Sequence, residues 1–153
     1  MTDPADAPAS DGVMIAFLPT TTDWCKIDLP HMTLVYAGTK SDLSPTAFSD
    51  LAKDAAALAS LSRPFYLRNL GVEQFGPPED RVNAFNLQAT TELWAMRRFV
   101  EKWNKSEYPF NPHVTIGPVT PFVDNAPGAI GFDRVYLGWG DDSLTFWLRG
   151  AGY

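Results

Sequence analysis

The sequence repeats one short pattern, His-x-Thr-aliphatic, at residues 31–34 (HMTL) and 113–116 (HVTI). These two tetrads contain both histidines of the 153-residue chain. Alternate residues of a β-strand point to the same side, so each histidine is expected to lie beside the threonine two positions later. The apolar residues between them would face the opposite, buried side. The pattern therefore predicts two strands that each present an imidazole and a hydroxyl together.

An imidazole pair suits the cleavage of a phosphodiester bond. One group must take a proton from the attacking water or hydroxyl, and another must protonate the departing oxygen. Imidazole, with an unperturbed pKa of about 6.5, serves either role near neutral pH. We expect His31 and His113 to divide these roles, while Thr33 and Thr115 donate hydrogen bonds to phosphate oxygens. One such strand would mean little, because β-branching alone favours threonine there, but two copies holding every histidine favour the catalytic interpretation.

The hydrophobic pattern predicts the elements that must position these tetrads. Strands are predicted at residues 14–18, 31–36, 64–72, 81–88, 113–116, 133–139 and 144–149. A helix is predicted over 45–61, with Ser44 as its N-cap and Pro45 in its first turn. Thr90 and Thr91 are expected to cap a second helix. This order is an α+β pattern with mostly short connections.

The second helix is expected to be amphipathic. Its apolar face is predicted to consist of residues at helical spacing, namely Leu93, Met96, Phe99, Val100 and Trp103. Residues 96–98 (MRR) predict a solvated basic face beside it.

Composition favours one compact domain over residues 13–153, preceded by a disordered tail at 1–12 that is rich in Pro, Ala and Asp. No apolar run spans a bilayer and no secretory signal is present, so we expect a cytoplasmic protein without a membrane partner. Cys25 is the single cysteine, which excludes an internal disulfide and argues against an all-protein zinc site. The formal charge of −6 argues against the binding of long nucleic acid and is compatible with the binding of a small nucleotide in a pocket.

Residues 31–38 (HMTLVYAG) and 110–117 (FNPHVTIG) resemble the signature of the 2H (two-histidine) phosphoesterases, and the order of elements is similar over about residues 13–149. The resemblance implies a bilobal fold, in which two pseudo-symmetric antiparallel sheets with helices outside surround a central cleft. It implies that His31 and His113 are the catalytic acid/base pair and that Thr33 and Thr115 contact the phosphate. It also implies that neither a metal nor an organic cofactor is needed.

Within this family the chain looks most like phage-type anti-CBASS phosphodiesterases. That resemblance implies a small or cyclic oligonucleotide substrate, met in the host cytoplasm if the chain is phage-encoded. An enzyme that processes RNA ends, as a 2′,3′-cyclic phosphodiesterase or a 2′-5′ RNA ligase-like protein, is the alternative. A protein that binds a nucleotide without cleaving it is another. No obligate protein partner is evident.

Three residues of the late predicted strands are further candidates for substrate binding. Trp139 and Trp147 border the cleft by the same resemblance, where a ring face would stack on a base. Packing within the core or the sheet is the alternative for both. Arg149 is a candidate for pairing with a phosphate. The sequence leaves open which nucleotide is bound, which linkage is cut and which histidine is the base.

Overall fold

The computed structural model describes residues 11–25, 27–118 and 126–151. Within them the strands and α-helices follow the order β1 (Gly12–Pro19), β2 (Met32–Thr39), α1 (Pro45–Leu61), β3 (Phe65–Phe75), β4 (Val82–Leu87), α2 (Thr91–Val100), β5 (His113–Pro118), β6 (Ala129–Trp139) and β7 (Asp142–Trp147). The predicted α+β order is confirmed. Residues 1–10 of the predicted tail lie outside the described residues, whereas Gly12 already belongs to β1. No helix in the described ranges is long and apolar enough to cross a membrane.

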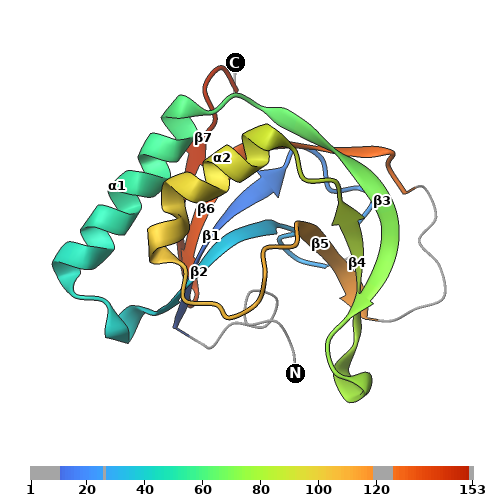
Figure 1. Cartoon of the computed structure of the whole chain (residues 1–153), viewed down its shortest axis with the longest axis horizontal. Coiled ribbons are helices and arrows are strands. Elements are labelled where there is room, and N and C mark those ends of the chain that lie inside the picture. The colour runs from blue at the N-terminus through green and yellow to red at the C-terminus, as the bar shows by residue number, and fades with distance from the viewer. Residues whose placement is uncertain (1–10, 26, 119–125, 152–153) are drawn as a thin grey trace.

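The strands form two antiparallel groups that share β3 (Figure 1). The hydrogen-bonded order is β2-β1-β6-β3-β4-β5, and β7 pairs with β6. The first group consists of β1, β2, β6 and β7, and the second of β4 and β5. The predicted arrangement of two antiparallel sheets is therefore confirmed, with the addition that one strand joins them.

Strand β3 changes its partner in the middle. Its first residues, Phe65 to Arg68, pair with β6, and from Asn69 onward it pairs with β4. The register shifts between Asn69 and Gly71, where the Asn69 side chain donates to the Pro127 carbonyl and accepts from the Gly71 N–H. Gly71 has a φ of +116°, which a residue with a Cβ rarely adopts. Such an irregularity bends a strand and increases its twist.

The sheet curves back on itself, so that its two outermost strands, β2 and β5, contact each other. The segment that follows α2 runs along the free edge of β2 before it enters β5. There Lys105 donates its N–H to the Tyr36 carbonyl, and Asn104 accepts from the Tyr36 N–H. This segment covers an edge that would otherwise expose unpaired backbone groups.

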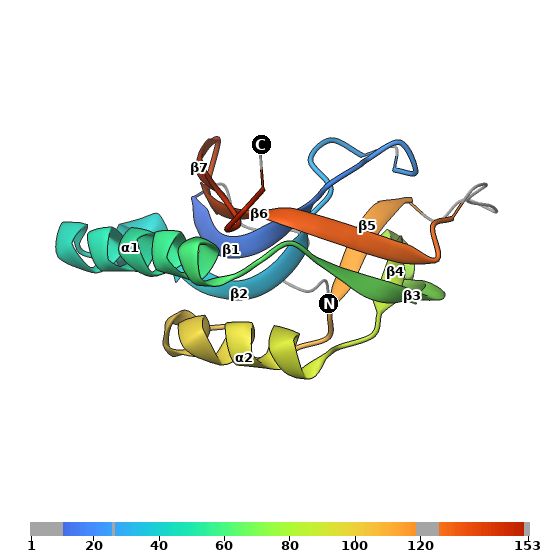
Figure 2. The same ribbon diagram turned by 90° about the horizontal axis from the view of Figure 1, so that it is seen from above.

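Both α-helices begin as the sequence predicts. Ser44 accepts a hydrogen bond from Ala47 N–H, and Thr90 accepts one from Leu93 N–H, each satisfying a backbone donor of the first turn. Helix α1 packs on β6 and β7, and α2 packs on α1 and β2 (Figures 1 and 2). Both helices therefore contact the first group of strands.

The predicted face of α2 is wrong at two positions. Phe99 is 39% exposed, whereas Arg97, expected on a solvated face, is only 6% exposed. The buried residues of α2 are Leu93, Arg97 and Val100, which lie four and three positions apart and so share one side of the helix. Arg98 is exposed, as predicted.

A polar contact ties α1 to the short 3-10 helix η3 (Glu101–Trp103). The Trp103 indole N–H donates to the Asp54 carboxylate at 2.8 Å, and Lys102 pairs with the same oxygen at 3.0 Å. Burial alone raises the pKa of the Asp54 carboxyl, but the bonds from Trp103 and Lys102 outweigh it and hold the pKa below its ordinary value. The contact thus anchors the start of the segment that leads to β5.

Asp54→Ala is expected to lower the free energy of unfolding by about 1–2 kcal/mol in urea denaturation, because the half-buried indole N–H loses its acceptor. Asp50→Ala removes the same charge from an exposed position of α1 and is expected to change it by less than about 0.5 kcal/mol. Since the folded-state pKa of Asp54 is lowered, its contribution is complete above the ordinary pKa and is lost as the pH falls through the lowered value. Equal stability of the two variants at neutral pH would contradict this role.

Candidate active site

His31 lies directly before β2, and its ring is anchored by the backbone. Its Nδ1 is 3.0 Å from the Leu29 carbonyl oxygen. Leu29 has a φ of +50°, the one positive value at a non-glycine residue in the described ranges, and its side chain is 44% exposed. Because core packing does not account for this conformation, we attribute it to the turn that aims the carbonyl at the imidazole. His31 Nε2 is buried without a hydrogen-bond partner.

His113, the first residue of β5, is held in the same way. Its Nδ1 is 2.7 Å from the Asn111 carbonyl oxygen, again two residues earlier. The ring stacks on Phe75 from the end of β3, with 4.7 Å between centroids and 19° between planes, and the residue is 6% exposed. His113 is therefore more tightly enclosed than His31, although the two anchors match.

These anchors define which nitrogen of each imidazole carries chemistry. A carbonyl oxygen only accepts hydrogen bonds, so Nδ1 carries the proton in the neutral ring of both His31 and His113. Nε2 is then the atom that accepts or delivers a proton. A fixed tautomer and a fixed ring direction are what a general acid or base requires.

The alternation predicted for the tetrads is confirmed. The apolar members, Met32, Leu34, Val114 and Ile116, lie in the core. Thr33 and Thr115 are half-buried on the opposite side of their strands. The Thr33 hydroxyl lies 3.9 Å from the Met14 sulfur.

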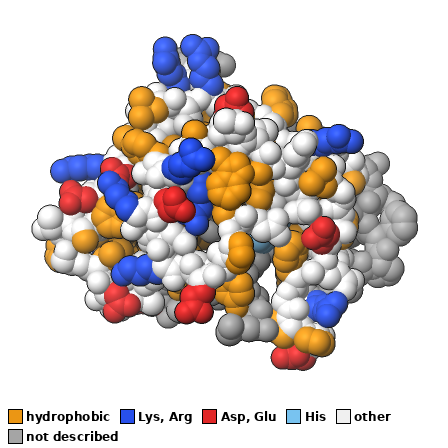
Figure 3. All heavy atoms as spheres, in the orientation of Figure 1, with side chains coloured by type: hydrophobic (Ala, Val, Ile, Leu, Met, Phe, Trp, Pro, Cys, Tyr) orange, Lys and Arg blue, Asp and Glu red, His pale blue; other side chains and the backbone are white. Residues whose placement is uncertain are grey.

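A cavity lies between the facing edges of the two sheets. It is open to solvent, and its lining includes both Thr33 from β2 and His113 from β5. Figure 3 shows this face of the molecule hollowed, with histidine surface inside the hollow and hydrophobic side chains at its rim. The structure thus brings one residue of each tetrad to one cavity, whereas the side chains of His31 and Thr115 are not part of its lining.

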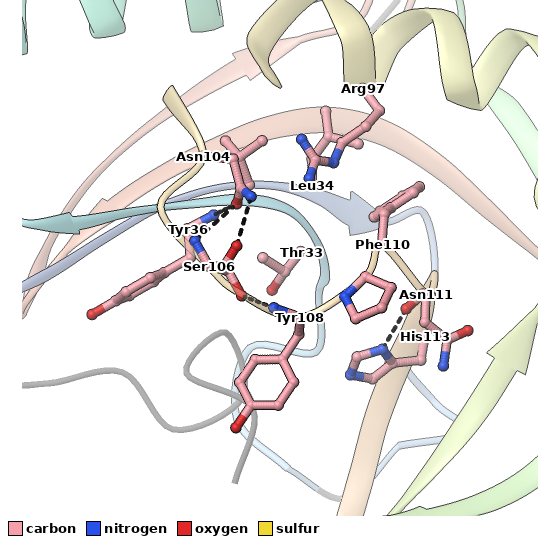
Figure 4. Close-up of a pocket in the computed structure, with 12 residues that line it drawn as sticks. Thr33, Leu34, Tyr36, Arg97, Asn104, Ser106, Tyr108, Phe110, Asn111 and His113 are labelled. Carbon is pink, nitrogen blue, oxygen red and sulfur yellow. Dashed lines mark hydrogen bonds between the residues drawn. The ribbon is translucent and has the colours of Figure 1, made fainter. Parts of the chain in front are cut away.

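Sequence reasoning missed several residues of this cavity. Arg97 reaches it from α2, while Tyr108, Phe110 and Asn111 come from the segment before β5 (Figure 4). Asn86 of β4 lies opposite His113 in the strand pairing, so their side chains are neighbours. The spacing of Arg97 from Leu93 and Val100 was the available signal. Tyr108, Phe110 and Asn111 lie in a segment without periodicity.

The three candidates of the late strands, Trp139, Trp147 and Arg149, lie elsewhere. Trp139 packs edge-on against Phe48 of α1, at 4.9 Å between centroids, as its core-packing alternative predicts. Trp147 is 54% exposed on β7, and the Arg134 guanidinium lies over its ring. Arg149 is exposed, and its backbone N–H donates to the carbonyls of the α1 C-terminus. None of the three lines the cavity between β2 and β5.

The residues that the structure describes include no group of three or more His, Cys, Asp or Glu side chains placed to hold a metal ion. Cys25 lies close to the site, with its Sγ 3.8 Å from the Thr115 carbonyl oxygen. The polar side chains that line the cavity are one imidazole, several hydroxyls, two amides and one guanidinium.

The family description 2′-5′ RNA ligase superfamily matches residues 26–130, more than half of the chain. The chain belongs to this superfamily, whose phosphoesterases and ligases act on phosphodiester bonds. The matched range includes both His-x-Thr tetrads. A comparison with curated protein sequences found no match.

Solved structures share the fold. TT0787 of Thermus thermophilus is 18% identical with a TM-score of 0.62, covering 92% of this chain and 99% of that chain. E. coli LigT complexed with NADP+ is 17% identical with a TM-score of 0.58, covering 91% and 95%. Kluyveromyces marxianus Usb1 is 11% identical with a TM-score of 0.63, covering 92% and 100%. E. coli LigT has also been crystallised with 3′-AMP, ATP and phosphate.

The anchoring carbonyls predict one tautomer for both histidines. In the neutral protein, long-range ¹H–¹⁵N correlation spectra are expected to show Nδ1 protonated and Nε2 bare in His31 and His113 alike. The chain has no other histidine, so the His31→Gln spectrum assigns both rings. A proton on Nε2 of either neutral ring would contradict the anchored geometry.

Proposed function

We propose that the chain is a metal-independent phosphodiesterase in which His31 and His113 are the acid/base pair. The observation that carries the proposal is the matched anchoring of both rings, each through Nδ1 to the carbonyl two residues earlier. The matched anchoring gives both rings the same tautomer and makes Nε2 the nitrogen that exchanges a proton in each. His31 directly precedes β2 and His113 begins β5, and these two strands contact each other. The chain also belongs to a superfamily that acts on phosphodiester bonds.

The proposed reaction uses the two Nε2 atoms in opposite protonation states. One neutral imidazole takes a proton from the attacking water or ribose hydroxyl, whose oxygen bonds to phosphorus. The other imidazole is protonated, and it gives its Nε2 proton to the departing oxygen as the bond between that oxygen and phosphorus breaks. The proton gained by one ring equals the proton lost by the other. Thr33 and Thr115 stabilise the charge that develops on the non-bridging oxygens.

The proposed substrate is a small or cyclic oligonucleotide. The cavity is lined by hydroxyls, amides, one imidazole and one guanidinium, polar groups of the kind that orient a small ligand. The net charge of −6 disfavours long nucleic acid. E. coli LigT, with the same fold, has been crystallised with mononucleotides and phosphate. We extend the proposal to cyclic oligonucleotide defence signals of the anti-CBASS kind.

Processing of RNA ends is the second candidate. It is favoured by the superfamily description, which names 2′-5′ RNA ligases. A panel separates the candidates: 2′,3′-cyclic mononucleotides, 2′-5′ and 3′-5′ dinucleotides, and cyclic oligonucleotides, with products identified by mass spectrometry. Cleavage of the cyclic oligonucleotides alone supports the first candidate, and cleavage of 2′,3′-cyclic or 2′-5′ ends alone supports the second.

His31→Ala and His113→Ala are each expected to lower kcat by about 10²- to 10⁴-fold, because each removes one proton-transfer role. The double variant should lose less than the product of the single losses, since the two groups act as a unit. Thr33→Val and Thr115→Val should cost about tenfold each, the worth of one hydrogen bond. These rates are measured on the best substrate of the panel.

Thr46→Val, an exposed position of α1, is the matched control for the threonine variants and should leave kcat unchanged. Circular dichroism of each histidine variant checks that it is folded. Full activity in both histidine variants would contradict the mechanism. Tight nucleotide binding without cleavage of any panel member would instead favour the binding protein.

EDTA is expected to leave turnover unchanged, because two imidazoles supply both proton transfers. The same mechanism predicts a bell-shaped dependence of kcat/KM on pH, since one ring must be neutral and the other protonated. Loss of activity on chelation, followed by recovery with a divalent cation, would overturn the metal-independent assignment.

A further inference from the structure

Arg97 has a charge that the described part of the protein does not neutralise. The residue is 6% exposed, and both its Nε and Nη1 are buried without a hydrogen-bond partner. Its close contact is with the face of Phe110, whose ring centroid lies 5.3 Å from the guanidinium carbon. Desolvation lowers the pKa of the guanidinium, partly offset by the nearby Glu101 carboxylate. Arginine nevertheless remains charged in proteins.

A buried charge without a partner is costly, and structures normally pair it or hydrogen-bond it. Arg97 occupies the core-facing side of α2, between Leu93 and Val100, which are fully buried. An apolar residue would suit that position better. The N–H groups of a guanidinium form a planar fork that fits the two oxygens of a phosphate or carboxylate. The unpaired N–H groups of the Arg97 guanidinium are therefore suited to bind an anion.

A second unpaired polar group lines the same cavity. The Tyr108 hydroxyl is buried without a partner, and both Tyr108 and Arg97 belong to the lining that includes Thr33 and His113. In Figure 4 the Arg97 guanidinium enters from α2 at the end of the cavity away from the His113 imidazole, with Thr33 and Phe110 between them. The cavity thus has a basic end that is separate from its imidazole end.

We propose that Arg97 binds a second phosphate of the substrate, one that is not cleaved. The inference rests on the proposed function and narrows it to nucleotides that carry at least two phosphate groups. The scissile phosphate occupies the His-x-Thr end, and its neighbour along the chain or ring of nucleotides pairs with the guanidinium. Such a contact selects oligonucleotides over cyclic mononucleotides.

Binding is compared for two ligands that differ by one phosphate, 3′-AMP and adenosine 3′,5′-bisphosphate, by isothermal titration calorimetry. The parent protein is expected to bind the bisphosphate about ten- to a hundredfold more tightly, the usual worth of a hydrogen bond to a charged group. Arg97→Gln should abolish this preference and leave the affinity for 3′-AMP within about threefold. Tyr108→Phe should keep the preference, because the Tyr108 hydroxyl points away from the Arg97 guanidinium (Figure 4).

Arg98→Gln is the matched control, since it removes the same charge from the next, exposed position of α2, and it should keep the preference. Arg97→Met keeps the experiment decisive if Arg97→Gln folds poorly, because an apolar side chain suits the buried position. Both Arg97 variants should lose the preference. A parent protein without the preference, or one whose preference survives both Arg97 variants, would overturn the inference. If the Arg97 variants bound both ligands more weakly by the same factor, Arg97 would contact the scissile phosphate, and the inference would also be overturned.

A second experiment, which measures turnover, separates this inference from the proposed function. Adenosine 2′,3′-cyclic phosphate and its 5′-phosphorylated form contain the same cyclic diester, so the ratio of their kcat/KM values reports the second phosphate alone. The parent should favour the 5′-phosphorylated form, and Arg97→Gln should bring the ratio near one while retaining turnover. Equal ratios in parent and variant overturn the inference and leave the phosphodiesterase standing. An Arg97-dependent binding preference in a protein that cleaves no panel member supports the subsite and counts against the phosphodiesterase.

Discussion

Strand β3 hydrogen-bonds to β6 through its first residues and to β4 through the rest, and this change of partner makes the cavity. In a flat sheet of order β2-β1-β6-β3-β4-β5, the five steps from β2 to β5 would separate them by about 24 Å. That distance is too great for two imidazoles to share one phosphate. The shift between Asn69 and Gly71 and the resulting curvature bring β2 and β5 into contact instead.

In both motifs a backbone carbonyl, and not a neighbouring carboxylate, orients the imidazole. Each histidine follows a proline, and the carbonyl before that proline receives the imidazole Nδ1–H. A serine-protease-like carboxylate partner is unnecessary for this orientation, because a carbonyl fixes the tautomer equally well. The cost is visible at Leu29, whose positive φ is of the kind that persists where surrounding structure imposes it.

Short sequence patterns predicted many of the helices and strands and the position of both tetrads. The start of α1 follows from Ser44 and Pro45, and the burial of the aliphatic members of both tetrads follows from strand alternation. The buried face of α2 was predicted less well, because an arginine is normally exposed, whereas Arg97 is buried. Tyr108 and Asn111 belong to a segment whose path along β2 depends on distant pairing with Tyr36. No local pattern encodes that pairing.

The unsatisfied buried atoms of the described residues belong to the two motifs, the strand beside His113 and the cavity lining. Among the described residues, the buried side-chain atoms without hydrogen-bond partners belong to His31, Asn86, Arg97 and Tyr108. All four come from the His-x-Thr tetrads, the strand beside His113, or the cavity lining. An unsatisfied buried polar group costs about 1–3 kcal/mol, and native proteins keep few of them. A phosphate oxygen that accepts from the Arg97 guanidinium would recover such free energy only on binding. Asn86 Oδ1 and the unprotonated His31 Nε2 are acceptors, so they pair with donors of the ligand, such as a hydroxyl, and not with its phosphate oxygens.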